Sequence, residues 1–184
     1  MVTSQRSELG AKLRDRTATL GEVFAWLSAL YFRGKLTYAQ QFGVPLVMAP
    51  GLGLRPAADR IASADLRAMG KVEVESEQFV TPLRRDAELV TREYGALAQV
   101  VLLGSIATGK YVDTLIDVFG ERLLFPESFV GRGDMSRGGL MLRAARSGEE
   151  LAYRPVLGAI RKGTRPPKLP KPPRAPRTLD GDRE

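Results

Sequence analysis

The 184-residue sequence contains neither cysteine nor histidine. Without cysteine there are no disulfides, no thiolate metal sites and no cysteine nucleophile. Without histidine the chain lacks the commonest general base, the commonest metal ligand and every Ser-His-Asp arrangement. Any catalysis must therefore rest on carboxylates, on Lys, Tyr, Ser or Thr side chains, or on backbone dipoles. The sequence gives no reason to expect a cofactor or a resident metal ion.

Long apolar runs are also missing. No stretch reaches the roughly 18 apolar residues that a membrane span needs. Residues 1–16 are too polar and too acidic to form a secretory signal. With 43% hydrophobic and 27% charged residues, the composition is that of a globular protein with one complete core. We therefore expect a cytoplasmic protein.

The formal net charge of +7 is concentrated near the C-terminus. Residues 161–184 hold 8 Lys/Arg against 3 acids, which leaves 20 against 18 in residues 1–160. Residues 164–177 (TRPPKLPKPPRAPR) carry six prolines and no acid, so they cannot pack a core. We expect residues 1–160 to form a single domain, with 1–43 as its N-terminal helical part, and residues 161–184 to be an extended or disordered tail.

The tail has two interpretations. Its cations could neutralise phosphates of a nucleic acid without reading bases, which would give salt-sensitive binding. Alternatively, it is a solubilising segment or a proline-motif ligand for a protein partner. The cations concerned are Arg161, Lys162, Arg165, Lys168, Lys171, Arg174 and Arg177.

The region before residue 44 is predicted to be helical. The segment Thr19-Leu20-Gly21-Glu22 has the form of a capping box and precedes apolar residues at helical spacing. It predicts an amphipathic helix over 20–33. Gly34 is expected to separate or kink this helix from a second one over 35–42, which Gly43 ends.

From residue 44 onward, short apolar runs alternate with helical patterns, as in a mostly parallel sheet with crossover helices. The predicted strands cover 45–49, 72–74, 99–103, 122–125 and 151–156. The predicted helices cover 56–69, 81–94, 111–119 and 137–147, and Thr81-Pro82 is a favourable helix start. The predicted fold is therefore α/β, a three-layer sandwich with a mostly parallel central sheet of about five strands, plus N-terminal helices.

In open parallel sheets, ligands bind beyond the carboxyl ends of the strands, where helix N-termini and their free amides collect. This rule selects the loops 50–55, 76–81, 104–110 and 126–136. The predicted ligand-binding residues in or beside them are Gly51, Gly53, Gly104, Ser105, Lys110, Ser128, Arg132, Ser136 and Arg137. The alternative for the loop GRGDMSRGG is a turn capped by Ser136 and salt-bridged by Asp134.

The segment GSIATGK, followed by Tyr111, raises the question of a phosphate-binding loop. Its spacing matches G-x-x-x-x-G-K-[ST] up to the last position, where Tyr111 replaces the hydroxyl that would hold magnesium. No predicted strand ends in the supporting Asp. These departures argue against an ordinary P-loop NTPase, although a nucleotide hydrolase that uses Lys110 is a third reading. We expect Gly104 to Lys110 to form one wall of the crevice.

The order of these loops resembles the uracil-DNA glycosylase superfamily over roughly residues 44–150. The segments that carry the resemblance are MAPGLGL, VVLLGSIATGKYVDTL, RLLFPES and FVGRGDMSRGGLMLRAARSG. The first falls where the family has its water-holding loop, and FPES falls where the family has a His-Pro-Ser loop. However, FPES lacks the histidine that stabilises the departing base, and MAPGLGL lacks an acidic or amide residue to position water.

The resemblance implies a domain that binds a nucleotide or a nucleic acid and that could act on a glycosidic bond. Glu127 or Asp134 would then hold the water that attacks the glycosidic carbon. Whether the chain is an enzyme stays open. The alternative function is a non-enzymatic interaction module that docks partner proteins through its N-terminal helix and its proline-rich arm. We expect no membrane partner in either case.

Overall fold

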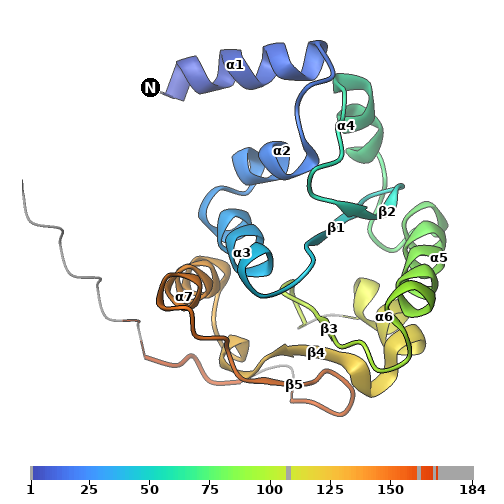
Figure 1. Cartoon of the computed structure of the whole chain (residues 1–184), viewed down its shortest axis with the longest axis vertical. Helices are drawn as coiled ribbons and strands as arrows, with labels where there is room; N and C mark the ends of the chain where they lie inside the picture. Colours follow the sequence, from blue (N-terminus) through green and yellow to red (C-terminus); the bar gives the residue numbers. More distant parts are fainter. Residues whose placement is uncertain (1, 107–108, 161–162, 168, 170–184) are drawn as a thin grey trace, which may run out of the picture.

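A computed structural model describes residues 2–106, 109–160, 163–167 and 169. Helices make up most of its regular structure (Figure 1). The helices are α1 (Val2–Arg14), α2 (Leu20–Leu27), α3 (Ala29–Phe42), α4 (Ser63–Met69), α5 (Glu77–Tyr94), α6 (Lys110–Phe119) and α7 (Asp134–Ser147), with 3-10 turns η1 (Gly120–Arg122) and η2 (Glu127–Phe129). The strands are β1 (Leu46–Ala49), β2 (Gly53–Pro56), β3 (Val100–Val101), β4 (Leu123–Pro126) and β5 (Tyr153–Pro155).

The predicted sandwich around a five-stranded parallel sheet is wrong. The chain is 53% helical and 12% strand, and its strands form two small sheets. β1 and β2 form an antiparallel hairpin, and the other sheet has the order β3-β4-β5. Only the β3–β4 pair is parallel, because β5 returns antiparallel along β4. Strands do occur within or beside the predicted ranges 45–49, 99–103, 122–125 and 151–156, but a pattern of apolar runs does not specify which strands pair.

One predicted strand is replaced by turns, and one predicted loop contains a strand. The segment KVEVES, predicted as a strand over 72–74, forms turns between α4 and α5, where Val72 and Val74 are partly buried against the core. The segment PGLGLR, predicted to lead from a strand into a helix, is the tip of the β1–β2 hairpin and the strand β2. The following helix is consequently short, since α4 begins only at Ser63.

Several helix ends were predicted correctly. The capping box is present, because the Thr19 hydroxyl accepts from the Glu22 amide at 3.2 Å and the Glu22 carboxylate accepts from the Thr19 amide at 2.8 Å. Gly43 and Gly95 follow the last residues of α3 and α5. The start of α5 was placed too late: it begins at Glu77 after Ser76, so Pro82 lies inside the helix.

The break in the N-terminal helices lies at Ser28–Ala29 rather than at Gly34. Ala29 has a φ of 44°, and Ser28 ends α2. Gly34 is instead inside α3, where it meets Gly138 of α7. A Cβ on Gly34 would lie 2.7 Å from the Gly138 carbonyl oxygen, and a Cβ on Gly138 would lie 3.0 Å from the Leu30 carbonyl oxygen. The absence of a side chain at Gly34 and Gly138 therefore allows α3 and α7 to cross at close range.

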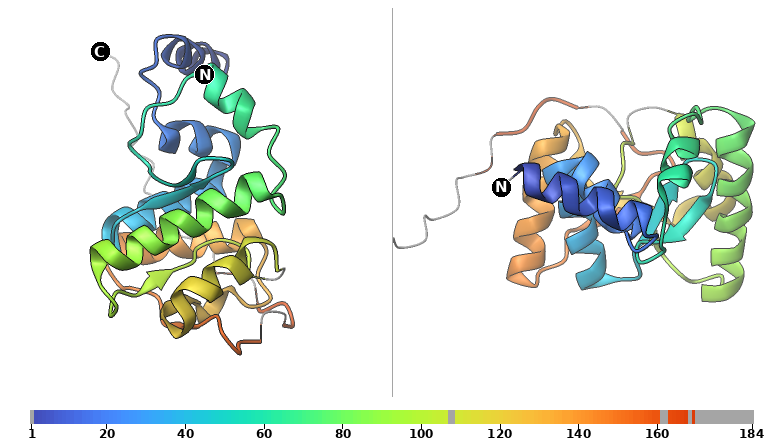
Figure 2. Two further views of the ribbon diagram at one scale, coloured as in Figure 1. Left: turned by 90° about the vertical axis from the view of Figure 1, so that its right-hand side faces the viewer. Right: turned by 90° about the horizontal axis from the view of Figure 1, so that it is seen from above.

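Two hydrophobic clusters hold the elements together. The larger one joins α3, α5, α6 and α7 around the fully buried strand β4 and includes Leu83, Phe125 and Met141. The smaller one joins α2, the β1–β2 hairpin and α4, and α1 packs against it. Figure 2 shows this second group stacked beyond α3 and α5. Among the described residues, no helix has the length and apolarity to span a bilayer.

Candidate functional site

The carboxyl ends of β3 and β4 meet the starts of α6 and α7 on the side that α3 covers (Figures 1 and 2). Polar side chains from these elements gather there. We name this group the α3–α7 cluster, and its members are Tyr31, Lys35, Tyr111, Asp134 and Arg137. It includes one predicted catalytic residue, Asp134, and one predicted ligand-binding residue, Arg137.

Arg137 is the centre of the cluster. Its side chain is only 8% exposed, and its guanidinium lies over the Phe129 ring at 5.4 Å from the ring centroid. The Nε atom is buried and has no hydrogen-bond partner in the described part of the chain. Its ion-pair partner is Asp134, at 3.9 Å, and that carboxylate is 64% exposed. A buried guanidinium is thus left with a free donor and one distant, solvated counter-charge.

Lys35 supplies a second cation one helical turn from Tyr31. Its ammonium nitrogen lies 3.9 Å from the centroid of the Tyr31 ring. Burial lowers the pKa of Lys35 to about 8; Asp134 opposes the shift and Arg137 adds to it. The lysine consequently carries its charge at neutral pH at a cost to the fold, and it would gain from an anion placed beside it.

Two tyrosines close the cluster. The Tyr31 hydroxyl donates to the Leu103 carbonyl at 3.2 Å, and the Tyr111 hydroxyl donates to the Ser105 carbonyl at 3.0 Å. Burial raises the pKa of both tyrosines, and a contact from Arg137 to the Tyr31 hydroxyl partly opposes that rise. Both phenols are therefore neutral hydrogen-bonding groups that fix the loop after β3.

The loop after β3 contributes through its backbone. Tyr111, the departure from the phosphate-loop pattern, packs its hydroxyl against Gly104, where a Cβ would lie 2.7 Å from that oxygen. At the sequence position where a phosphate-binding loop has the Ser or Thr that holds magnesium, this chain has Tyr111, and its phenol anchors the loop after β3. Lys110 begins α6, and its side chain lies outside the described part of the structure.

Ser128 and the loop before α7 lie next to the cluster. Ser128 precedes Phe129, the residue on which Arg137 packs, and its hydroxyl is buried without a partner among the described residues. Arg132 donates to the Ser128 carbonyl at 2.9 Å and to the Ser136 hydroxyl at 3.3 Å. Ser136 thus accepts from Arg132 and does not cap α7, whose cap position is Gly133.

Glu127, the other predicted catalytic residue, has a different environment. Its carboxylate accepts from Arg154 Nε of β5 at 3.1 Å, and both side chains are about half exposed. Among the described residues, its ion-pair partner is Arg154, which is not a member of the α3–α7 cluster. Asp134 is the carboxylate that lies beside Arg137.

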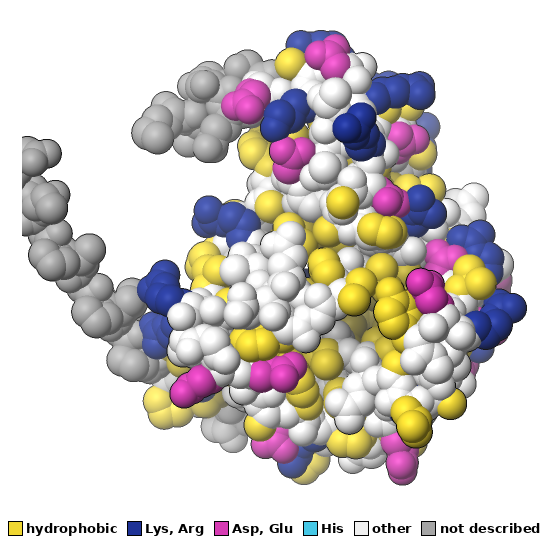
Figure 3. All heavy atoms as spheres, viewed as in Figure 1, with side chains coloured by type: hydrophobic (Ala, Val, Ile, Leu, Met, Phe, Trp, Pro, Cys, Tyr) yellow, Lys and Arg dark blue, Asp and Glu magenta, His cyan; other side chains and the backbone are white. Residues whose placement is uncertain are grey.

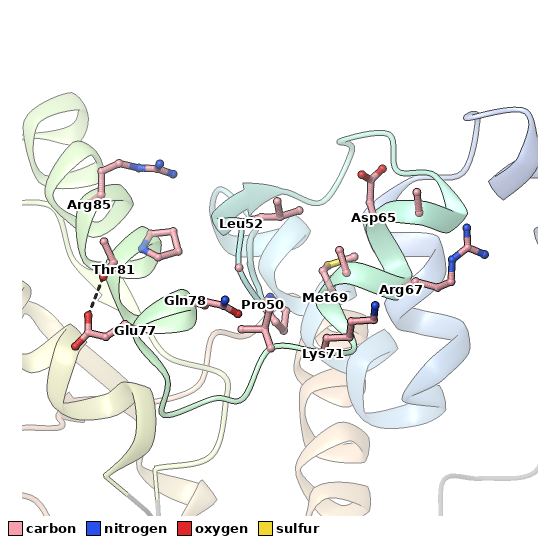
Figure 4. Close-up of a pocket in the computed structure, with 15 residues that line it drawn as sticks. Pro50, Leu52, Asp65, Arg67, Met69, Lys71, Glu77, Gln78, Thr81 and Arg85 are labelled. Atoms are coloured by element: carbon pink, nitrogen blue, oxygen red, sulfur yellow. Dashed lines mark hydrogen bonds between the residues drawn. The ribbon is translucent and has the colours of Figure 1, made fainter.

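Gly51 and Gly53 belong to a second region. The hairpin tip, α4 and the first turns of α5 line a groove of about 970 Å³ (Figure 4). Gly51 lies in its wall, whereas Gly53 has a φ of 87° and packs against the Asp86 carboxylate, which accepts from the Leu54 amide at 3.0 Å. The structure therefore does not bring these two glycines into the α3–α7 cluster.

The charges of the groove are engaged locally or directed outward. Asp65 accepts from the Ala62 amide, Glu77 from Thr81, and Arg85 pairs with Asp86 at 2.7 Å. Figure 4 shows Lys71 beside Pro50 at the base of the groove, while Arg67 extends away from α5. Figure 3 shows hydrophobic side chains around a hollow on the face that carries the hairpin, with most Lys and Arg side chains toward the edges.

Of the predicted tail cations, Arg165 is described and is exposed. The others, Arg161, Lys162, Lys168, Lys171, Arg174 and Arg177, lie outside the described residues. The described residues also contain no group of three or more carboxylates that could hold a metal ion.

Sequence reasoning missed Lys35, Tyr31 and Tyr111 as site residues. Tyr31 was considered only as part of the predicted helix over 20–33, and Lys35 was taken as the start of a separate helix. A usable signal was the pair of glycines Gly34 and Gly138, because small residues inside two helices permit a close crossing that would bring Lys35 next to Arg137. Comparison with known proteins adds no candidate, since no family model, no curated protein and no solved structure matches the chain.

Proposed function

We propose that this chain binds a nucleotide or a nucleic acid strand through a phosphate group at Arg137, between α3 and α7. The observation that carries the proposal is the buried guanidinium of Arg137, whose Nε has no acceptor in the part of the chain that the structure describes. A buried hydrogen-bond donor without an acceptor costs about 1–3 kcal/mol, and more when it belongs to a charged group. A ligand that supplies the missing acceptor would remove that cost.

The surroundings of Arg137 favour a phosphate over a smaller anion. A guanidinium presents a planar fork of donors that matches phosphate oxygens. Lys35 provides a second positive charge, and the free hydroxyl of Ser128 provides another donor near the same loop. The rings of Tyr31 and Tyr111 are partly buried beside these groups and supply apolar surface for the rest of a nucleotide.

Arg137→Gln tests this proposal because glutamine keeps much of the side-chain length and loses the charge. We expect it to weaken binding of thymidine 5′-monophosphate by more than about tenfold, as measured by calorimetric titration. Arg146→Gln is the matched control, since Arg146 is exposed in the last turn of the same helix. Equal binding by both variants and the unchanged chain would disprove the site.

Action on a glycosidic bond is an extension of the same proposal. Asp134 lies beside Arg137 and is solvent-accessible, so it could hold a water for attack on a glycosidic carbon while Arg137 holds the phosphate. Glu127 is paired with Arg154 and is the weaker candidate. Full retention of a measured glycosidase activity in Asp134→Asn would remove Asp134 from this role, and Glu127→Gln provides the comparison.

A second function has one observation in its favour. Trp26 and Leu27, at the end of α2, are 45% and 53% exposed. The two residues form an exposed apolar surface that could dock a partner protein. Peptides selected for binding to the chain should lose affinity for a Trp26→Ser/Leu27→Ser variant if this surface is the docking site.

A further inference from the structure

The tip of the β1–β2 hairpin holds an apolar side chain at the groove without burying it. The Leu52 amide donates to the Ala49 carbonyl at 2.9 Å. Pro50 and Gly51 lie between these residues, and Gly51 has a φ of 76°, as a type II turn requires at its third position. A Cβ on Gly51 would lie 3.1 Å from the side chain of Val72, which also lines the groove, so the tip is packed in place. Leu52 lines the groove and is 40% exposed.

The two helices beside the hairpin add further apolar surface. Ala64 and Ala68 line the groove one helical turn apart on α4, and both are exposed. Their small side chains allow a partner to approach the helix closely. Pro82 lines the groove from α5, and Figure 3 shows hydrophobic side chains around a hollow on the face that carries the hairpin. A hollow apolar surface of this kind is typical of an interaction site.

Pro82 also leaves a backbone acceptor on the α5 side of the groove. Because proline has no N–H, the carbonyl of Gln78 cannot receive the usual helical hydrogen bond from residue 82. Gln78 and Pro82 lie one turn apart and both line the groove, and Figure 4 shows the Gln78 side chain pointing toward Pro50. Gln78 therefore offers a carbonyl and an amide group to a ligand with N–H donors. A peptide has such donors, whereas a hydrocarbon chain has none.

Two cations of the groove are placed to meet an acidic ligand. In the part of the chain that the structure describes, Lys71 makes no hydrogen bond and no ion pair, and Figure 4 shows it at the base of the groove. Arg85 pairs with Asp86 through its Nε, but its side chain is 60% exposed and points toward the hairpin in Figure 4. The Lys71 ammonium is therefore the cation with most to gain from a carboxylate in the groove.

The acids that line the groove are already bonded within their own helices or caps. Asp65 accepts from the Ala62 amide at 2.8 Å, and Glu77 accepts from the Thr81 hydroxyl at 3.1 Å. Figure 4 shows Glu77 directed away from the hairpin. Charge complementarity therefore favours a ligand that is acidic as well as apolar.

We propose that the groove binds a short acidic segment of a partner protein. Leu52 and Pro82 contact an apolar side chain of that segment, and Lys71 pairs with one of its carboxylates. N–H groups of the segment donate to Gln78. In this mode of recognition, apolar side chains anchor a peptide in a groove while charges fix its orientation. The inference is independent of the phosphate site at Arg137.

A phage library of random peptides, selected on the full chain, supplies the probe. We expect the selected peptides to combine Asp or Glu with Leu, Ile, Phe or Met. They are then synthesised with a fluorescein label and titrated with variants of the chain. Selected peptides without an excess of acidic residues would overturn the proposal.

Leu52→Ser tests the apolar contact. We expect it to weaken binding of the selected peptides by about fivefold or more, because it removes an exposed anchor at the groove. Leu97→Ser is the matched control, since Leu97 is 94% exposed between α5 and β3 and does not line the groove. Equal affinity of the peptides for these two variants overturns the proposal.

Lys71→Glu tests the ion pair and remains informative if Leu52→Ser perturbs the hairpin. We expect it to weaken binding by about threefold or more, and replacement of one acidic residue of the peptide by Lys should restore affinity for this variant. A variant that had only lost its fold would not be restored. Arg92→Glu, at an exposed position in the last turn of α5, is the control. An equal loss for Arg92→Glu, or no restoration at any acidic position, overturns the proposal.

Other occupants of the groove would give different results. Self-association of the chain in sedimentation velocity that Leu52→Ser abolishes would assign the groove to a second copy and overturn the proposal. Peptides that lose affinity for the Trp26→Ser/Leu27→Ser variant and keep it for Leu52→Ser would place the docking surface at the end of α2, which also overturns it.

Discussion

The α3–α7 cluster and the groove between α4 and α5 both contain cations, yet Arg137 in the cluster is buried whereas Arg85 in the groove is largely exposed. In the groove, Arg85 pairs with Asp86, and the remaining carboxylates bond to their own helices. In the cluster, Arg137 is buried and its Nε has no acceptor among the described residues, and Lys35 is partly buried with a lowered pKa. The unsatisfied buried donor therefore selects the cluster over the groove.

The difference follows from what each region does for the fold. The wall of the groove is stabilised by Asp86, whose carboxylate holds the β2 backbone against α5. The cluster is created by the crossing of α3 and α7, which the contact of Gly34 with Gly138 permits. Because the two helices are tightly packed at this crossing, the polar side chains cannot move apart. The free-energy cost of holding Arg137 and Lys35 close together therefore remains until an anionic ligand binds between them.

The largest expected effect comes from breaking the crossing. Gly34→Ala would place a Cβ 2.7 Å from the Gly138 carbonyl oxygen and 2.9 Å from the Gly138 Cα, so α3 and α7 must separate. We expect a loss of about 3 kcal/mol in the free energy of unfolding, the upper range for overpacking of backbone. Urea denaturation followed by circular dichroism measures it.

Gly139→Ala is the control for that experiment. Gly139 neighbours Gly138 in α7, and its Cβ would meet only Leu169 at an ordinary 3.9 Å. Alanine should stabilise the helix there by up to about 1 kcal/mol. Similar destabilisation by Gly34→Ala and Gly139→Ala would show that the crossing is looser than the structure indicates.

The next effect concerns the buried charge of Lys35. Its pKa of about 8 in the folded chain lies below the ordinary 10.5, so the unfolded chain binds more protons between those pH values. The free energy of unfolding should therefore rise with pH through this window. Lys35→Met should be more stable than the unchanged chain at pH 7, by the order of 1–3 kcal/mol, and the difference should shrink as pH rises above 8.

The same titration predicts a pH dependence of binding. A bound phosphate favours the charged form of Lys35, so binding should weaken as pH rises through about 8. Lys35→Met should bind more weakly at pH 7 and lose that part of the pH dependence in a fluorescence titration. An identical pH profile for both proteins would place Lys35 outside the binding site.

Features set by neighbouring residues were predictable from the sequence, whereas features set by tertiary contacts were not. The capping box at Thr19 and the glycine stops were predicted because they depend on neighbours along the chain. The sheet was predicted wrongly because strand pairing depends on distant residues, and PGLGLR fits a hairpin as well as a loop before a helix. Arg137 and Asp134 were found from their loop, but Lys35 was not, because its proximity depends on a helix crossing.

A smaller effect tests the groove side of the comparison. Asp86→Ala removes the acceptor of the Leu54 amide at a buried position, and we expect a loss of about 1–3 kcal/mol in the free energy of unfolding. Arg85→Ala removes an arginine whose side chain is 60% exposed and should cost less than about 0.5 kcal/mol. Both should bind nucleotide normally; weaker binding in either variant would move the site toward the groove.

The smallest expected effect on stability belongs to Ser128→Ala. Its hydroxyl is buried and has no partner among the residues that the structure describes. Removing it takes away an unsatisfied group, so the melting temperature should stay the same or rise slightly. If that hydroxyl contacts a bound phosphate, the variant should nevertheless bind thymidine 5′-monophosphate several-fold more weakly. The variant would then be as stable as the unchanged chain or more stable, but it would bind the nucleotide more weakly. That combination is expected for a side chain that contributes to ligand binding and not to folding. A loss of stability with unchanged affinity would instead show that Ser128 supports the structure of the loop. Arg137 and Lys35 would then be the residues that distinguish the α3–α7 cluster from the groove as a binding site.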